Sequence, residues 1–307
     1  MATESPATVL VAVGANAAIA VAKGTAAAMT GSASMLAEAV HSLVDAGNGC
    51  LLLVGLRRAS LPPDANHPFG HGKELYFWTF VVAVVIFGLG GGVTIIEGID
   101  HLRHPVAPQD VLVAYIVLGV AFAFESISFV VAIRALRREE PAGSVLRAIV
   151  RSKDPAIFAV VLEDFAALCG LVIAFAGTIA SEVSSDGRYD GAASIAIGVL
   201  LIGVALVLIW QVQGLLIGES ADPGVVRCIE RIAIAQPSVA SVRRTLTMHL
   251  GPEDILVAID LVFHADASLG DVAATIDRIQ EGVKREQTAV REIFVEVDAL
   301  MRRPLRA

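Results

Sequence analysis

Six long apolar stretches dominate the first 213 residues and limit what this chain can fold into. They cover roughly residues 8–29, 33–56, 74–99, 111–133, 155–180 and 191–213. Each stretch is long enough for a helix to cross the hydrocarbon core of a membrane, which takes about 20 mostly apolar residues. With 55% hydrophobic and 18% charged residues, the chain also has too little polar surface for a soluble protein of 307 residues. We therefore predict an α-helical membrane protein with six transmembrane helices.

The distribution of Lys and Arg predicts the orientation of these helices. If both termini are cytoplasmic, nine basic residues fall in inner loops and two in outer loops. The nine are Arg57, Arg58, Lys73, Arg134, Arg137, Arg138, Arg147, Arg151 and Lys153, and the two are Arg103 and Arg188. Because cytoplasmic loops are enriched in basic residues, we predict cytoplasmic N- and C-termini. Residues 1–8 contain Glu4 and no basic residue, so we expect no cleaved leader and favour a bacterial plasma membrane.

The pattern changes after residue 213 to that of a small soluble domain. Asp222 and Pro223 are suited to open a helix that runs to about residue 236, and Ser268 with Asp271 to open a second that runs to about 286. Alternating apolar residues predict strands over 242–250, 254–264 and 291–298. We therefore predict two domains, a transmembrane domain over 1–213 and a cytoplasmic α+β domain over 214–307 with the ferredoxin-like order αββαβ.

The second apolar stretch contains a candidate metal-binding pair, His41 and Asp45. The two are one helical turn apart and therefore share a face, which Asn48 extends by a further turn. An imidazole nitrogen and a carboxylate at this spacing can bind one cation. Ionisable residues inside a membrane span are costly, which favours a functional role. The alternative is a hydrogen-bonded pair that only ties helices together.

The fifth stretch supplies two adjacent acids, Glu163 and Asp164. Asp164 lies nine residues after Pro155, about 14 Å along the helix axis and near the middle of the membrane. Neighbouring side chains on a helix point about 100° apart, so only one of the two acids faces a central site. We assign Asp164 to the site and keep Glu163 as a possible extra ligand. The alternative is that both acids line a water-filled cavity.

A second candidate site lies in the loop between the second and third stretches. Proline and glycine between Asp64, His67 and His71 allow a turn that brings these three side chains together around a metal. A hydrogen-bonded cap on the third helix is the alternative.

Weaker candidates lie in the soluble domain and elsewhere in the membrane. If two of the predicted strands are neighbours, Asp260 could form a cytosolic cation site with Glu296 and Asp298, although we favour a solvated polar sheet face. Lys23 and Glu125 are expected to pair or to line the cavity. The spacing of Gly88 and Gly92 is typical of close helix packing, for example at a dimer seam.

Taken together, these features resemble the cation diffusion facilitator family over nearly the whole chain. The resemblance rests on the motif from His41 to Asp45, the loop from His67 to Lys73, the six spans and the αββαβ tail. It implies a homodimeric, proton-coupled exporter of zinc or a related divalent ion, with a tetrahedral site between the second and fifth helices. It also implies that His41, Asp45 and Asp164 fall on transport-site positions, and that Asp64, His67 and His71 fall on the interhelical loop site.

One departure from the family pattern concerns the fourth ligand. The family commonly has His or Asp one turn before Asp164, where this chain has Val160. Glu163, Asn48 or a water molecule could complete the shell, and the Leu-Glu-Asp motif at 162–164 resembles a branch that includes organellar members. More oxygen ligands favour harder ions. We expect Zn2+ first, with Mn2+, Co2+ or Fe2+ as possible substrates.

The predicted function is therefore efflux of a divalent metal cation in exchange for protons. We expect no enzymatic activity, no required cofactor and no nucleic-acid partner. The soluble domain is expected to form the homodimer and to sense cytosolic metal. The main alternative is a membrane scaffold or metal-sensing receptor that acts through this domain. A membrane metalloenzyme built on the loop residues is disfavoured, because the chain has no H-E-x-x-H helix.

Overall fold

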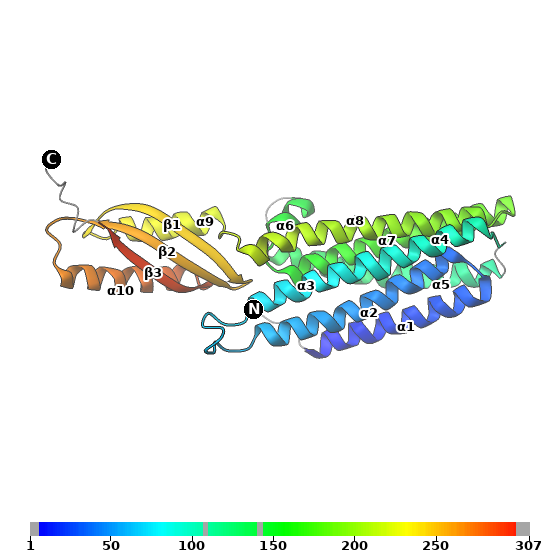
Figure 1. Ribbon diagram of the computed structural model, residues 1–307, viewed down its shortest axis with the longest axis horizontal. Coiled ribbons are helices and arrows are strands. Elements are labelled where there is room, and N and C mark those ends of the chain that lie inside the picture. Colours follow the sequence, from blue (N-terminus) through cyan, green and yellow to red (C-terminus); the bar gives the residue numbers. More distant parts are fainter. Residues whose placement is uncertain (1–5, 107–109, 140–143, 299–307) are drawn as a thin grey trace. The chain divides into compact units, whose positions relative to one another are not determined.

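The structure is a computed structural model that describes residues 6–106, 110–139 and 144–298. The chain forms two compact units. One unit runs to Arg58 and resumes over Glu74–Gln213, and the other comprises Ala59–Lys73 and the chain from Gly214 onward. The first is a bundle of long helices and the second a small α+β unit (Figure 1). The loop Ala59–Lys73 thus groups with the C-terminal unit, although the sequence-based division leaves it with the transmembrane domain.

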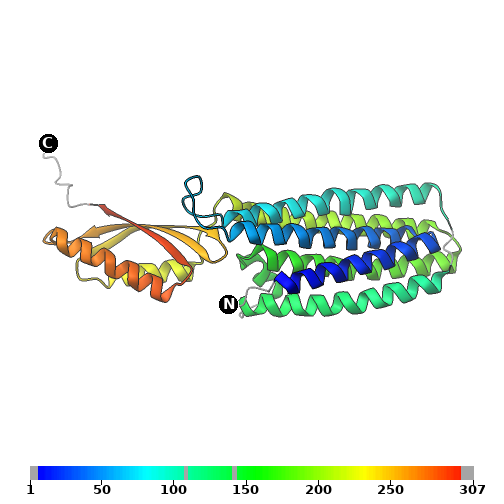
Figure 2. The same cartoon turned by 90° about the horizontal axis from the view of Figure 1, so that it is seen from below.

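Long helices occupy all six apolar stretches and run lengthwise beside one another (Figure 2). They are α1 (Pro6–Thr30), α2 (Ala33–Ala59), the third helix, α5 (Val111–Glu139), α7 (Pro155–Ser184) and α8 (Arg188–Ile217). The third helix consists of α3 (Lys73–Val85), a π-helical segment η1 (Ile86–Val93) and α4 (Thr94–Arg103). Among the described residues, the five helices after α1 are long and apolar enough to cross a membrane. The role of α1 as a sixth span stays a prediction.

Sequence signals account for where some of these helices begin. The Asp154 side chain accepts a hydrogen bond from the Ala156 backbone N–H at 2.9 Å, and Pro155 occupies the first turn of α7. A short helix, α6 (Val145–Arg151), precedes it and was not predicted.

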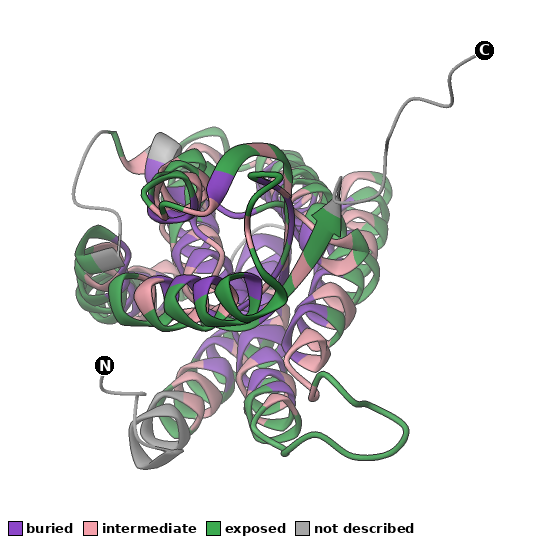
Figure 3. Cartoon of the chain, turned by 90° about the vertical axis from the view of Figure 1, so that its left-hand side faces the viewer, coloured by how far each residue is buried: buried purple, intermediate pink, exposed green. Residues whose placement is uncertain are grey.

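Buried residues gather on the sides of the helices that face one another (Figure 3). The bundle interior is therefore where buried polar side chains need a partner or a ligand.

Glycines bring the third helix and α8 into close contact. A Cβ atom at Gly98 would lie 2.9 Å from the carbonyl oxygen of Gly191, and one at Gly91 would lie 3.0 Å from that of Gly198. Only glycine lets two helix backbones approach this closely. A Cβ atom at Gly88, by contrast, would meet nothing within 4 Å in the described part of the chain. The packing within the chain therefore uses Gly91 and Gly98, and the dimer seam at Gly88 and Gly92 stays a prediction.

The C-terminal unit confirms the predicted order αββαβ. Its elements are α9 (Pro223–Ile234), β1 (Val239–Gly251), β2 (Asp254–Phe263), α10 (Leu269–Glu286) and β3 (Val290–Asp298). The central strand β2 pairs antiparallel with β1 and parallel with β3. The predicted capping box of Ser268 and Asp271 opens α10. Alternate residues of β2, including Val257 and Ile259, are buried with apolar residues of α9 and α10 in one core.

The loop before α3 packs on this sheet. A Cβ atom at Gly72 would lie 2.5 Å from the carbonyl oxygen of Leu250 in β1, so the loop backbone approaches the strand more closely than any other residue type allows. The ring of Phe69 meets that of Phe294 in β3 edge to face, with 6.3 Å between centroids. These contacts explain why the loop groups with the C-terminal unit.

Candidate metal sites

His41 and Asp45 lie buried in the bundle on one face of α2. Their side chains are 2% and 8% exposed, and His41 Nδ1 lies 3.5 Å from Asp45 Oδ1. Among the described residues, both ring nitrogens of His41 and Oδ1 of Asp45 have no hydrogen-bond partner. Each buried polar atom left in this state costs about 1–3 kcal/mol. A nitrogen donor and a carboxylate held in this way fit a divalent cation.

Helix α7 meets this face of α2 through Glu163. Asn48, which is fully buried, donates from Nδ2 to Glu163 Oε1 at 3.2 Å. Glu163 is itself buried, and Oδ1 of Asn48 lacks a partner among the residues that the structure describes. Asn48 thus adds an amide oxygen to the α2 face that carries His41 and Asp45, and Glu163 brings a carboxylate to Asn48 from α7.

Asp164 points to a different neighbour. Its Oδ2 accepts a hydrogen bond from Ser128 Oγ of α5 at 2.8 Å, and the side chain is only partly buried. On the sequence alone, Asp164 is assigned to the central site and Glu163 is kept as a possible extra ligand, whereas the hydrogen bonds connect Glu163 to α2 and Asp164 to α5. Asp164 still acts electrostatically on Asp45. Which of the two acids binds the cation stays a prediction, and the half-buried Val160 offers no ligand atom.

Lys23 of α1 pairs with Glu38 of α2 and not with Glu125. The ammonium lies 2.9 Å from Glu38 Oε2 and donates a second hydrogen bond to Ser42 Oγ, also at 2.9 Å. Lys23 and Glu38 are completely buried. Glu125 of α5 is buried as well and lies within electrostatic range of both. Glu38 and Ser42 were not singled out from the sequence, although a charged residue in an apolar stretch is a signal that could have identified Glu38.

Asp190, near the start of α8, was also not singled out from the sequence, and it binds the N-terminal end of α2. Its Oδ2 accepts hydrogen bonds from the backbone N–H groups of Ala33 at 2.5 Å and Ser34 at 3.3 Å. Its Oδ1 accepts from the hydroxyls of Ser32, at 2.9 Å, and Ser34. Asp190 therefore caps a helix other than its own, and this contact across 157 positions has no local sequence signal.

The loop site brings together its three predicted residues. One ligand atom from each of Asp64, His67 and His71 lies within 4.8 Å of the others. Asp64 Oδ1 is 3.3 Å from His67 Nδ1, and Asp64 Oδ2 is 3.2 Å from His71 Nε2. Asp64 is half-exposed, whereas the His71 side chain is only 8% exposed. Two imidazoles and one carboxylate form a suitable donor set for a transition metal.

Backbone hydrogen bonds stabilise the ionised form of the Asp64 carboxylate in this loop. Asp64 Oδ1 accepts from the backbone N–H groups of His67 and Asn66, each at 2.7 Å. The bond from His67 contributes most to lowering the pKa of Asp64 from 3.8 to about 2. Asp64 is therefore ionised at neutral pH, as a metal ligand must be.

In the sheet, Asp260 of β2 is in register with Glu296 of β3, as the proposed cytosolic site requires. Arg244 of β1 is in register with Asp260 and its side chain lies 3.9 Å from that of Glu296, so a cation already stands beside Glu296. Asp298 is in register with Val262, but its side chain lies outside the described residues. This arrangement fits a charge-paired sheet face better than a metal site.

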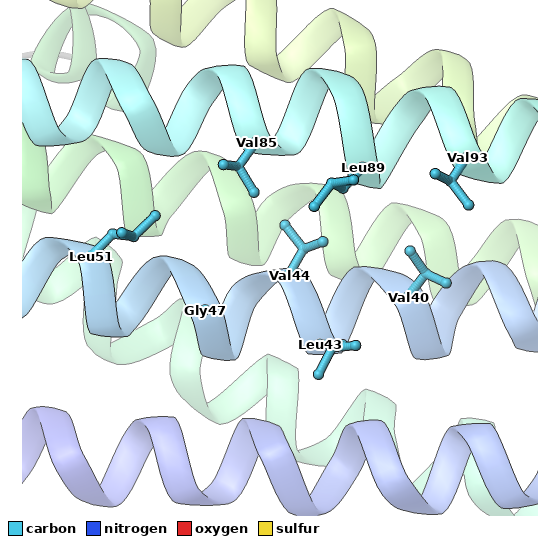
Figure 4. A pocket seen from close by; sticks show the side chains of 8 residues that line it. All are labelled: Val40, Leu43, Val44, Gly47, Leu51, Val85, Leu89 and Val93. Carbon is cyan, nitrogen blue, oxygen red and sulfur yellow. The ribbon is translucent and has the colours of Figure 1, made fainter.

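A groove between α2 and the third helix is apolar throughout (Figure 4). It is lined by Val40, Leu43, Val44, Gly47, Leu51, Val85, Leu89 and Val93. Without a polar side chain the groove cannot bind a cation, so the candidate site on α2 lies on a different face of that helix.

Comparison with known proteins shows a match to the cation efflux transmembrane domain family over residues 9–217. The chain is 38% identical over 190 residues to metal tolerance protein C4 of Arabidopsis thaliana, covering 61% of this chain and 42% of the plant protein. It is 33% identical over 224 residues to the mitochondrial proton-coupled zinc antiporter SLC30A9 of Mus musculus, covering 72% of this chain and 40% of the mouse protein. It is 22% identical over 268 residues to the manganese efflux system protein MneP of Bacillus subtilis, covering 87% of this chain and 86% of that protein. The chain thus spans less than half the length of the plant and mouse relatives.

Proposed function

Because the chain belongs to the cation efflux, or cation diffusion facilitator, family, we propose that it exports a divalent metal cation from the cytosol in exchange for protons. The observation that carries this proposal is that buried ligand atoms of His41 and Asp45, within an apolar helix, have no hydrogen-bond partner among the described residues. Asn48 on the same face of α2, and Glu163 of α7 bonded to it, supply further oxygen atoms.

In the proposed cycle, a hydrated ion enters from the cytoplasm and exchanges water for His41, Asp45 and an acid of α7. Binding requires deprotonated ligands, so metal and protons compete for the same atoms. After the helices rearrange to open the site on the other side, protons displace the metal. The shared ligands couple the two fluxes in opposite directions.

Zinc is the proposed substrate. Support comes from the similarity to the mouse protein, a proton-coupled zinc antiporter, and from the imidazole of His41, which suits Zn2+. The oxygen-rich remainder of the set is also compatible with Mn2+, the ion named for the Bacillus relative, and with Co2+ or Fe2+. Glu163 or Asn48 is the proposed fourth ligand in place of the position occupied by Val160.

The protein is an integral membrane protein, and we place it in a bacterial plasma membrane with both termini cytoplasmic. The basic residues of the loops support this orientation. The C-terminal unit is proposed to form a homodimer and to respond to metal bound at Asp64, His67 and His71. Its sheet contacts the loop that carries these ligands, through Gly72 and Phe69.

The test is zinc flux into vesicles reconstituted with the full chain under an imposed pH gradient. Wild type should move zinc in the direction opposite to proton flow, and Asp45→Ala should abolish this flux. Asp100→Asn, which changes an acid outside the site, is the control. Undiminished flux in Asp45→Ala would refute the site. A folded wild type that moves no divalent ion would refute the transporter and favour a scaffold or receptor.

A further inference from the structure

A buried charge pair lies beside the α2 site and has no role in the ligand set. Lys23 and Glu38 are 0% exposed and 2.9 Å apart. Removing two charges from water is costly, and their mutual attraction often does not offset that cost. A buried ion pair within apolar helices therefore points to a function in its own right.

The pair is next to the proposed ligands. Glu38, His41, Ser42 and Asp45 follow the spacing of one helix face, and the Lys23 ammonium contacts two of them, Glu38 and Ser42. The same ammonium acts electrostatically on both His41 and Asp45. An ammonium has three N–H donors, and two have acceptors among the described residues. Lys23 can therefore take a further acceptor from its neighbourhood.

The Glu38 carboxylate is held from the opposite side by α7. A Cβ atom at Gly170 would collide with Glu38 Oε1, so this oxygen lies directly against the α7 backbone. The same oxygen has no hydrogen-bond partner in the described ranges. Glu38 is thus fixed between Lys23 and Gly170, and its position determines where the ammonium lies.

We propose that Lys23 is a tethered cation that competes with the transported metal for Asp45, and that Glu38 is the positioning residue that holds the ammonium away while metal is bound. This inference rests on the proposed function. Asp45 lies about two helical turns beyond Glu38, and Ser42, which the ammonium already contacts, lies between them. The flexible four-carbon stem of lysine allows its ammonium to move from Glu38 past Ser42 towards Asp45. When neither metal nor a proton occupies Asp45, the ammonium pairs with it. When metal binds Asp45, the ammonium returns to Glu38.

The experiment compares zinc binding by titration of the purified full chain, separately from flux, with His67→Ala and His71→Ala present throughout to remove the loop site. Glu38→Gln removes the charge that holds Lys23, so the ammonium should move to Asp45 and weaken zinc binding by about tenfold or more. The double variant Lys23→Gln with Glu38→Gln lacks the competitor and should bind zinc within about threefold of wild type. Glu97→Gln, a half-buried acid of α4, is the matched control and should leave binding unchanged.

Two results would overturn the proposal. One is wild-type zinc affinity in Glu38→Gln, and the other is a loss of affinity that persists in the folded double variant. If Glu38→Gln does not fold, Gly170→Ala keeps every charge and displaces the Glu38 carboxylate. Gly170→Ala should weaken zinc binding, and adding Lys23→Gln to Gly170→Ala should restore it. Unchanged zinc binding in Gly170→Ala would equally refute the role of Glu38. Because binding is measured without flux, these outcomes are distinct from a wild type that transports no metal.

Discussion

Replacing Asp190 should destabilise the helical bundle more than replacing any exposed acid. Asp190→Ala removes one acceptor group from four buried donors, the hydroxyls of Ser32 and Ser34 and the first two backbone N–H groups of α2. The two hydroxyls lie 3.2 Å apart and can partly satisfy each other. The backbone donors have no such substitute inside the described bundle.

The magnitude follows from these contacts. Each buried donor left without an acceptor costs about 1–3 kcal/mol, and loss of a helix cap costs about 1 kcal/mol. With partial recovery by the hydroxyls, we expect Asp190→Ala to lower the free energy of unfolding by about 3 kcal/mol. Ser34→Ala removes a single side-chain donor and should cost about 1 kcal/mol.

The assay is equilibrium unfolding in mixed micelles of dodecyl maltoside and sodium dodecyl sulfate, followed by circular dichroism. Asp100→Asn is the control, because Asp100 and its partner His104 are 68% and 75% exposed and such pairs contribute at most about 1 kcal/mol. If Asp190→Ala lowers the free energy of unfolding by less than about 1 kcal/mol, water or another group replaces the cap, and the predicted cost of the unpaired donors is refuted.

Three further predictions follow from individual contacts. Glu163→Gln should lower zinc flux more than Asp164→Asn, since Glu163 contacts Asn48 of α2 whereas Asp164 contacts Ser128 of α5; the reverse order in the vesicle assay would restore Asp164 as the ligand. Gly91→Ala should destabilise the bundle by about 1–3 kcal/mol by forcing α8 away, whereas Gly88→Ala should have little effect, and equal stabilities in the unfolding assay would contradict the packing. The carboxyl NMR signal of Asp64 should titrate near pH 2. Because this pKa is lowered from 3.8, the stabilisation that the ionised Asp64 gives the loop is fully present above about pH 4 and is lost as the pH falls through 2. A titration midpoint at or above 3.8 would mean that the backbone hydrogen bonds to Asp64 are not formed.

The helices and the αββαβ order could be predicted because hydrophobic length, two-residue alternation and capping residues are local signals. The short helix α6 could not, since seven residues show too little periodicity. The convergence of Asp64, His67 and His71 was also predictable, because only seven positions separate the outermost two and glycine and proline shape the turn.

Contacts between helices could not be predicted in the same way. The 100° between Glu163 and Asp164 follows from helix geometry, but which acid faces α2 depends on how α7 is rotated against its neighbours. The pairing of Lys23 with Glu38, the cap from Asp190 and the approach of Gly72 to β1 likewise join residues that are distant in sequence. Such contacts leave no periodic signal in a single sequence.

The central claim is that His41 and Asp45 bind the transported cation, and counting bound zinc tests it most directly. In a His67→Ala and His71→Ala background, which removes the loop site, equilibrium titration should detect one zinc ion per chain. Adding Asp45→Ala should eliminate this binding in a protein that remains folded. Retention of the same zinc ion at the same affinity after that substitution would contradict the account.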